Sequence, residues 1–448
     1  MEKNRPRPRR NRGIERLKTV LIVLLSCSAV YLTARALVPS QNTAHPQGLL
    51  SGLSALLHPQ GAVSTPAANS TVQLTAAAQP VRIAVCDGAN RYAVQYNSAQ
   101  VDKLYDNVGI LLGEALASAR TPTPISEQRY QLALQSPGVW FDFLGNIPLD
   151  TLSAWTGEGT ANRILSGAAR QIAVALVDDG VGLYYHNEID GQFYACETGV
   201  IYADHMDRLL AEYGGNSMFF AFEQDEDSGY AALGPYVLLG PAAPTPAVYR
   251  VSNPLVSLDE SLIAELQQAL AFQTAYYPIP NGIRIREGQE TLEISSSGAV
   301  SYSMAENTGA SRYPVGNSAN GDTTELIETT RRMVTDTVGR YCSAARLYLM
   351  DIQQTDTGLE VYYGYSLNGA EVSLPGGNCA AKFTVEQGQI VSFTLFFRRY
   401  EDSGQTGLVP QERLAAAALE ALAPEGRELA LCYSDAGGDT VSAGWVAK

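Results

Sequence analysis

The sequence predicts an α+β protein with a single N-terminal transmembrane helix, a stalk, and two or three modules of antiparallel sheet with packed helices. Three observations support this fold class. An apolar stretch follows a basic segment near the N-terminus, the 448 residues are 46% hydrophobic, and helical periodicity alternates with β-hairpin signals. The order helix–hairpin–helix–sheet favours antiparallel α+β modules over a parallel α/β domain.

The charges of the chain fall into two groups. Residues 1–18 contain eight basic and two acidic side chains and carry +6, whereas the remaining residues carry −21, which together give the net charge of −15. Binding to phosphate groups requires clustered Lys and Arg, which the acidic part of the chain lacks. The composition therefore argues against nucleic acid as a partner.

Residues 19–38 form an apolar segment that contains one charged side chain, Arg35. A helix of this length spans about 30 Å, the thickness of the hydrocarbon core, and Arg35 near its end can snorkel to the interface. The positive-inside rule then predicts a cell-membrane protein with residues 1–18 as a cytoplasmic tail and an extracytoplasmic body. We expect an uncleaved signal anchor. The alternatives are a signal peptide cleaved near residues 34–36, a lipoprotein site at Cys27, and a buried soluble helix.

Residues 39–80 are expected to form a flexible stalk. No Asp, Glu, Lys or Arg occurs between residues 36 and 81, and the segment is rich in Pro, Ser, Ala, Thr and Gln. Residues 48–57 fit either a short amphipathic turn on the membrane surface or an apolar patch of linker. The stalk would hold the folded body away from the bilayer.

The first folded domain is expected at residues 81–246. Ser98 is predicted to cap a helix with one apolar face, and Asp-Gly pairs at 179–180 and 190–191 predict β-hairpins. Three prolines within residues 241–246 mark its end. The predicted elements are strands at 82–85, 92–96, 139–144, 172–177 and 181–185, and helices from 98 onward and over 204–213.

A central α+β domain is expected at residues 247–340. Ser257 and Glu260 have the spacing of a capping box that opens a helix, and Ser297 with Gly298 predicts a hairpin between strands 292–294 and 300–302. A polar loop over 306–321 and a second helix over 322–338 complete this domain.

A C-terminal domain of antiparallel sheet and helix is expected at residues 341–448. Turn residues separate a series of strands, and Pro410 occupies the first turn of a predicted helix that ends before Pro424. The predicted strands are 346–352, 359–366, 371–374, 382–385, 390–397, 429–433 and 441–446.

No motif with a catalytic mechanism occurs in the sequence. His186 and His205 each lie near acidic residues, but no activated nucleophile accompanies them, and we interpret them as hairpin-end and helix-face side chains. Residues 223–229 resemble part of a calcium loop but lack its later glutamate, so a solvated turn is favoured. The tyrosines within 362–365 either stack on sugars or place rings on both faces of a strand, and the second interpretation is favoured.

Five cysteines follow the apolar segment, namely Cys86, Cys196, Cys342, Cys379 and Cys432. Their odd number prevents complete pairing, and the lack of Cys-x-x-Cys spacing gives no support to a zinc or thioredoxin-type site. Scattered buried thiols are favoured, with a disulfide between Cys86 and Cys196 as the alternative. We expect no metal and no cofactor.

Taken together, the chain resembles the YycH/YycI family, membrane-anchored extracytoplasmic regulators of the WalK (YycG) sensor histidine kinase. The anchor resembles the basic and apolar N-terminal helix of the family, and three further segments resemble its strands and hairpins. Length and the extra N-terminal region favour the YycH type, whereas the long uncharged stalk departs from the family's compact connection. The four segments are residues 16–33, 139–148, 292–302 and 381–393.

The resemblance implies a regulator without catalysis whose transmembrane helix contributes to contact with the kinase. Its implied partners are a sensor histidine kinase of the WalK/YycG type, the membrane, and a companion protein of the YycH/YycI type. Two alternatives stay open: an anchored cell-envelope hydrolase with scattered carboxylates, and a wall- or peptide-binding module. The helix residues that we expect to contact the partner are Leu21, Leu24, Leu25, Ser28, Tyr31 and Leu32.

Overall fold

The computed structural model describes residues 78–157, 160–202, 206–225, 228–230, 233–305, 311–315, 323–422 and 428–448. By its contacts the chain forms two units, residues 1–65 and 66–448, and the described residues all belong to the second. The predicted basic tail, the transmembrane helix and most of the stalk therefore lie outside the described residues. Within the described ranges, no helix is both long and apolar enough to cross a membrane.

The predicted α+β class is confirmed, because several sheets and seven α-helices form within these ranges. The first sheet has seven described strands, all antiparallel, in the order β2-β1-β4-β5-β6-β7-β3. Their bounds are β1 (Arg82–Cys86), β2 (Arg91–Val94), β3 (Thr123–Ile125), β4 (Gly138–Pro148), β5 (Ala168–Val177), β6 (Gly180–Asn187) and β7 (Gln192–Glu197).

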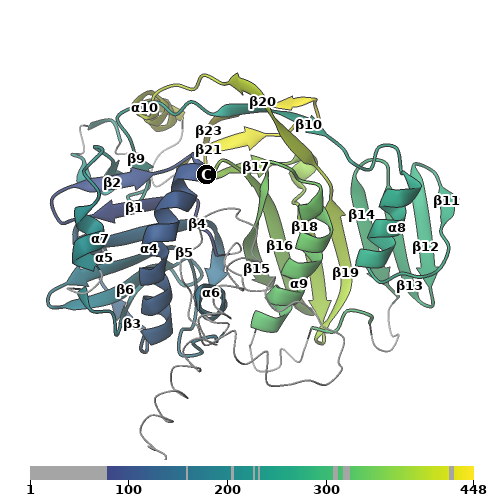
Figure 1. Ribbon diagram of the computed structural model, residues 1–448, viewed down its shortest axis with the longest axis horizontal. Coiled ribbons are helices and arrows are strands. Elements are labelled where there is room, and N and C mark those ends of the chain that lie inside the picture. Colours follow the sequence, from purple (N-terminus) through teal and green to yellow (C-terminus); the bar gives the residue numbers. More distant parts are fainter. Residues whose placement is uncertain are drawn as a thin grey trace, which may run out of the picture. The chain divides into compact units, whose positions relative to one another are not determined.

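Helices cover both faces of the seven-stranded sheet because its strands are apolar on both sides. Ile83 and Val85 of β1 share a core with α4 (Ser98–Ser118) and α6 (Leu149–Thr156). Ala84 points to the opposite face and packs with α5 (Glu127–Gln135). Figure 1 shows α4 lying across the strands of this sheet.

Two predicted helix caps are wrong in detail. The helix α4 is capped by Asn97 rather than Ser98, because the Asn97 side-chain oxygen accepts a hydrogen bond from the backbone N–H of Gln100 at 3.1 Å. The predicted capping box of Ser257 and Glu260 does not form. Asp259 stands at the N-cap of α8 (Glu260–Ala269), and the Ser257 hydroxyl donates to the Asp259 carboxylate at 2.9 Å.

The second sheet has eleven strands in the described part of the chain. Ten follow the order β11-β12-β13-β14-β19-β18-β16-β17-β21-β23, and β15 pairs with the other edge of β16. The pair β17–β21 is parallel and the others are antiparallel. The bounds are β11 (Tyr277–Ile279), β12 (Gly282–Glu287), β13 (Glu290–Ser295), β14 (Ala299–Met304), β15 (Arg346–Gln354), β16 (Gly358–Leu367), β17 (Ala370–Ser373), β18 (Ala381–Glu386), β19 (Gln389–Phe396), β21 (Leu429–Ser434) and β23 (Ala443–Ala447).

The helix α9 (Thr324–Asp336) packs on this second sheet, where the Thr330 hydroxyl and the Tyr363 hydroxyl of β16 lie 2.9 Å apart. Two small sheets complete the structure: β20-β10-β22 and β8-β9. The remaining elements are α7 (Asp207–Ala211), α10 (Glu412–Leu422), β8 (Phe219–Phe220), β9 (Leu238–Leu239), β10 (Ala247–Ser252), β20 (Arg399–Thr406), β22 (Thr440–Val441) and the 3-10 turns η2 (Ala221–Glu223), η5 (Val338–Arg340) and η6 (Pro375–Gly377).

The predicted division into domains at 81–246, 247–340 and 341–448 stays a prediction. The strand β14 of the central segment pairs with β19 of the C-terminal segment, so the second sheet crosses residue 340. The strand β10 likewise pairs with β20 and β22. The sequence prediction missed β10, β11, β12 and β20, which lie beside the strands that it identified.

Candidate functional site

The predicted partner-binding residues of the apolar segment lie outside the described residues, so their role stays a prediction. They are Leu21, Leu24, Leu25, Ser28, Tyr31 and Leu32.

The other candidates from the sequence are dispersed in the structure. The His186 ring packs on Phe193 with ring centroids 4.6 Å apart, and His205 lies outside the described residues. Part of the predicted acidic turn at 223–229 also lies outside them, while Glu223 forms an ion pair with Arg91. The tyrosines of β16 lie on both faces of the strand, as predicted: the Tyr363 ring is buried, and the Tyr362 hydroxyl donates to Glu360.

The five cysteines of the described part are unpaired; four are buried and Cys379 is half-buried. Burial raises the pKa of these thiols, to about 12 for Cys196 and about 11 for Cys342. A thiol with a raised pKa is a poor nucleophile at neutral pH. Within the described residues, no group of three or more His, Cys, Asp or Glu is arranged to hold a metal ion.

The sequence prediction missed a buried charge cluster that joins the two large sheets. It consists of Arg82 of β1, Asp142 of β4, Arg170 of β5, and Glu428, which precedes β21 of the second sheet. Asp142 is fully buried and Arg82 is 3% exposed. Antiparallel pairing puts Arg82 directly opposite Asp142, so the register of the first sheet builds half of the cluster.

Arg170 makes the strongest contacts in the charge cluster. Its Nε and Nη2 donate to the two carboxylate oxygens of Asp142, each at 2.9 Å, and its Nη1 and Nη2 donate to the two oxygens of Glu428. Arg82 Nη1 donates to Asp142 Oδ2 at 3.2 Å and to Glu428 Oε1 at 3.4 Å. Two cations and two anions therefore neutralise one another, with bidentate geometry on Arg170.

In the two carboxylates of the cluster, the effect of the neighbouring positive charges on the pKa outweighs the opposite effect of burial. Burial alone would raise the pKa of Asp142, but the guanidinium groups of Arg170 and Arg82 lower it to about 2. The pKa of Glu428 is also lowered, because hydrogen bonds from Arg170 and its charge outweigh burial. Both carboxylates thus stay ionised at neutral pH, which leaves no proton for general acid catalysis.

Aromatic and polar side chains surround Arg82 on the side away from Asp142. The guanidinium carbon of Arg82 lies 5.3 Å from the centre of the Tyr96 ring, and the Tyr96 hydroxyl accepts a hydrogen bond from the Leu431 N–H of β21 at 3.3 Å. Nε and Nη2 of Arg82 are buried and have no hydrogen-bond partner among the described residues. The Tyr96 ring therefore provides a cation–π contact to a guanidinium group whose hydrogen bonds are incomplete.

A second buried carboxylate lies near the cluster, at the start of α10. Glu412 is 4% exposed; its Oε2 accepts from the Gly240 N–H at 2.6 Å and its Oε1 accepts from Gln95 Nε2 at 3.2 Å. Burial raises the pKa of Glu412 to about 7, although the Gly240 hydrogen bond and the charge of Arg82 oppose the shift. This carboxylate is the one group near the described cluster with a pKa in the physiological range.

Two further contacts between the sheets lie along β15. Gly145 of β4 touches this strand so closely that a Cβ atom built there would stand 1.8 Å from the Leu349 carbonyl oxygen. The Arg346 guanidinium binds both carboxylate oxygens of Asp102 on α4, with Nη1 at 2.7 Å from Oδ1. The charge cluster and these β15 contacts fix the first sheet against the second.

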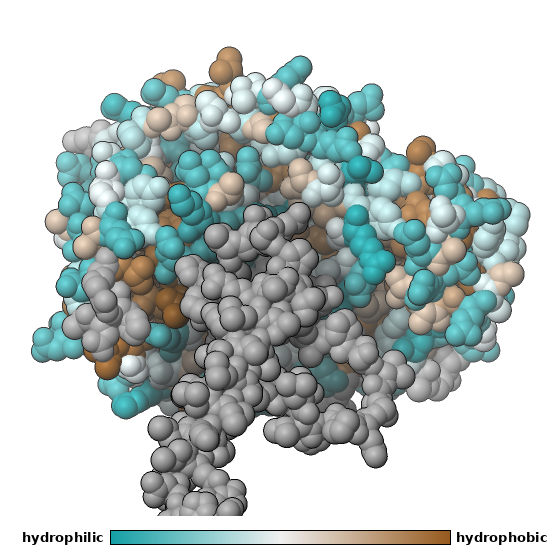
Figure 2. Space-filling model, in the orientation of Figure 1, coloured by the Kyte–Doolittle hydropathy of each residue, from teal (hydrophilic) through white to brown (hydrophobic). Residues whose placement is uncertain are grey.

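The arrangement holds elements of the two sheets in place through ion pairs. The cluster contains no nucleophile, and its charges are satisfied by one another. The exposed apolar residues are dispersed, and Figure 2 shows a face that is largely hydrophilic with apolar side chains in small groups. The largest exposed fractions are those of Leu408 (96%), Ile189 (72%) and Val256 (70%).

One signal in the sequence could have indicated the cluster. Asp142 interrupts the apolar strand segment 139–144, and a charged residue at the centre of a strand that is apolar on both sides requires a partner. Arg82 and Arg170 lie next to apolar strand segments in the same way. Glu428 could not be found by this argument, because it belongs to a distant part of the chain.

Comparison with known proteins identifies the fold. No protein-family model and no curated protein matches the sequence. The structure is similar to the crystal structure of YycH from Bacillus subtilis, with a TM-score of 0.53 and 12% sequence identity, over 84% of this chain and 94% of the YycH chain. The resemblance that the sequence indicated is confirmed at the level of the fold: the chain has a YycH-like fold.

Proposed function

We propose that this protein is a non-enzymatic, membrane-anchored regulator of a two-component sensor histidine kinase of the WalK/YycG type. The observation that carries the proposal is the YycH-like fold, which extends over 84% of the chain. The basic tail and the apolar segment at 19–38 supply the expected anchor, with an extracytoplasmic body. An accessory protein of this kind acts by binding.

The described side chains favour a function in binding over a function in catalysis. The buried Asp142 and the half-buried Glu428 are engaged in ion pairs, and burial raises the pKa values of the thiols. A bound regulator changes the output of its partner if it binds the two kinase states with different affinities. A difference of about 1–3 kcal/mol changes the equilibrium about 5- to 150-fold.

We assign the contact with the kinase to the apolar helix, through Leu21, Leu24, Leu25, Ser28, Tyr31 and Leu32, and to the body. A companion protein of the YycH/YycI type is the expected second partner.

Co-purification from native membranes tests the proposal. The tagged full chain is compared with a variant in which residues 19–38 are replaced by an unrelated transmembrane helix, and kinase autophosphorylation is measured with and without each. We expect the kinase to co-purify with the full chain, in reduced yield with the replaced helix, and its output to change. Absence of the kinase in both preparations contradicts the proposal.

The same preparations address the two alternatives. Release of soluble fragments from isolated cell wall by the purified full chain would identify an envelope hydrolase. Binding to isolated wall without any change in kinase output would identify a wall- or peptide-binding module. Either outcome overturns the regulator assignment.

A further inference from the structure

The carboxyl group of Glu412 connects three parts of the chain that are far apart in sequence. Glu412 is the first residue of α10 and is 4% exposed. Its Oε2 accepts a hydrogen bond at 2.6 Å from the N–H of Gly240, directly after β9, and its Oε1 accepts one at 3.2 Å from Gln95, directly after β2. One side chain therefore attaches α10 both to the first sheet and to the small sheet β8-β9.

The apolar contacts of α10 come mainly from small side chains. Ala416 and Leu419 pack with Leu239 of β9 and Leu429 of β21 in a core cluster of their own. Five of the eleven residues of α10 are alanine, whose side chain buries little apolar surface, and Leu414 is 63% exposed. The contact at Glu412 therefore accounts for a larger share of the attachment of α10 than it would in a helix rich in buried leucine.

Among the described residues, the groups that face Glu412 provide no ion pair for it. Arg82 of β1 and the N-terminal end of α10 attract the ionised form, but Arg82 is paired with the two acids of the charge cluster. Tyr96 after β2 and Tyr230 before β9 stay uncharged at neutral pH, because burial raises the pKa of both. Arg413, the next residue of α10, is exposed. An ionised Glu412 is therefore a buried charge without a cation in contact, which is costly.

The neighbouring amide can accommodate an uncharged Glu412. Oε1 of Gln95 is buried and has no hydrogen-bond partner among the described residues. When this amide turns over, its oxygen faces Glu412 and can accept the proton of the carboxyl group. The protonated form then keeps its contacts with Gly240 and Gln95 without a buried charge. In agreement with this geometry, burial raises the pKa of Glu412 to about 7.

We propose that Glu412 is a pH-sensitive switch, which holds α10 on the body when its carboxyl group is protonated and releases the helix when the group ionises. In the released state the carboxylate regains water, and Leu239 and Leu429 lose their contacts with α10. The proposal goes beyond the regulator function and does not require a kinase partner.

Hydrogen exchange of the purified full chain, measured by mass spectrometry, reports the release of α10. Peptides from α10 are compared with peptides from α9 in the same sample, so that the effect of pH on the intrinsic exchange rate cancels. A pKa of about 7 in the attached state and an ordinary value of about 4.5 in the released state predict that opening of α10 relative to α9 increases roughly 20-fold from about pH 5.5 to about pH 7.5. An equal response of the two helices to pH overturns the proposal.

A pair of matched variants tests whether Glu412 is the titrating group. Glu412→Gln cannot ionise, and we expect the ratio of α10 to α9 exchange to become independent of pH. Glu260→Gln makes the same change at the exposed first residue of α8, and we expect it to leave the response intact. Circular dichroism checks that both variants fold; if Glu412→Gln does not, the comparison of the two helices in the unmodified chain decides.

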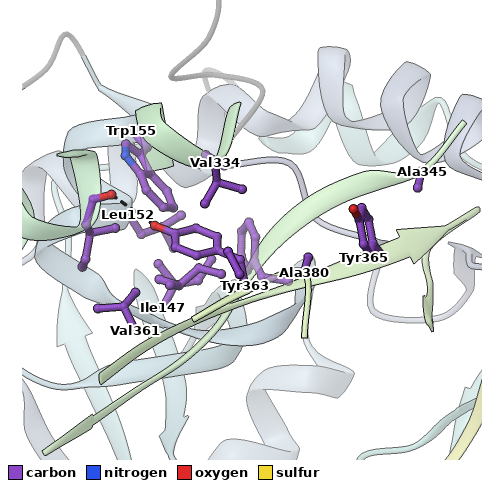
Figure 3. Close-up of a cluster of buried hydrophobic side chains, with 14 of the residues drawn as sticks. Ile147, Leu152, Trp155, Val334, Ala345, Val361, Tyr363, Tyr365 and Ala380 are labelled. Carbon is purple, nitrogen blue, oxygen red and sulfur yellow. Dashed lines mark hydrogen bonds between the residues drawn. The ribbon is translucent and has the colours of Figure 1, made fainter. Parts of the chain in front are cut away.

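A third variant separates the switch from a general loss of stability. Figure 3 shows Val361 within a cluster of buried hydrophobic side chains that includes Ile147 and Tyr363, and Val361 is 0% exposed. Val361→Ala should lower the stability of the body without changing the response of α10 to pH. Loss of the response in Val361→Ala or Glu260→Gln, or its persistence in Glu412→Gln, overturns the proposal.

Discussion

The two large sheets meet in two chemically different ways. At the charge cluster, Asp142 and Arg82 are buried, Arg170 and Glu428 are 13% and 22% exposed, and the two cations and two anions balance in charge. Along β15, the contact consists of a close backbone approach at Gly145, a half-exposed ion pair and a pocket of about 430 Å³. A buried ion network permits few geometries, whereas an apolar contact beside a cavity tolerates small displacements. We therefore expect the first contact to be the less deformable of the two.

Removal of the central acid should have the largest effect on stability. In Asp142→Ala the guanidinium groups of Arg82 and Arg170 lose the buried one of their two shared acids and keep only Glu428, and we expect a loss of about 3–5 kcal/mol in unfolding free energy. Urea unfolding of the full chain measures it. Glu197→Ala, which removes the acid of the exposed pair with Arg120, is the control. Equal losses in the two variants would show that the charge cluster contributes no more to stability than an exposed ion pair.

Glu412 should make stability depend on pH in the direction opposite to Asp142. Its folded pKa of about 7 lies above the unfolded value, so the folded state holds this proton longer, and its contribution to stability is lost as pH rises from about 4.5 to 7. Glu412→Gln should abolish this slope and raise stability at pH 8 by on the order of 2–3 kcal/mol. The new amide can still accept from Gly240, and it can donate to Gln95 if the Gln95 amide turns over so that its Oε1, now without a partner, takes the place of Nε2. If the pH dependence of stability is the same in Glu412→Gln as in the unmodified chain, the raised pKa does not belong to Glu412.

Asp142 has a folded pKa of about 2, below its unfolded value, so its contribution is present above about pH 4 and lost as pH falls toward 2. Unfolding curves recorded from pH 2 to 8 should therefore show stability falling at both ends of the range, and Glu412→Gln should remove the fall at the upper end alone.

Addition of a methyl group at the β15 contact should have a smaller effect. In Gly145→Ala the Cβ would lie 1.8 Å from the Leu349 carbonyl oxygen, so the two strands must separate. We expect a loss of about 1–3 kcal/mol, measured by thermal unfolding. Gly180→Ala is the matched control, because a Cβ there meets nothing within 4 Å. A neutral Gly145→Ala would show that this contact gives way more easily than the structure indicates.

The smallest effect is expected from Arg346→Ala. The Arg346 side chain is 43% exposed and that of Asp102 is 29% exposed, so solvent screens the pair. A loss below about 1 kcal/mol in urea unfolding is expected, and it should shrink further in high salt. A loss comparable to that of Asp142→Ala would mean that both contacts are electrostatic in character.

Local signals in the sequence predicted most individual elements and missed those whose partners are distant. The apolar face of α4 and the hairpins of β5–β6 and β13–β14 agree with the structure because periodicity and turn residues act within a few positions. The strand β20 carries Glu401, Asp402 and Gly404, a polar composition untypical of a strand, and it forms through pairing with β10. Tertiary pairing here outweighs propensity.

The candidate site was harder to predict than the fold for the same reason. Asp142 could be identified as a charge in need of a partner, but its neighbours come from β1, β5 and the segment before β21. The pocket of about 430 Å³ beside β15 likewise combines Trp155 with Val334 and Leu349, which no local pattern connects. The register of each sheet and the contact between sheets determine such sites.

The charge cluster also has a consequence for the order of synthesis. Arg82 and Glu428 are separated by 346 residues, which ribosomes take roughly 20–70 s to add at about 5–20 residues per second. Asp142 and Arg170 are added within this interval, and for the 258 residues between Arg170 and Glu428 Asp142 is the one acid of the cluster present beside two arginines. The first sheet therefore completes its charge balance only when the segment with Glu428 arrives, and a chain that ends before that point keeps one arginine of the cluster without a matching acid.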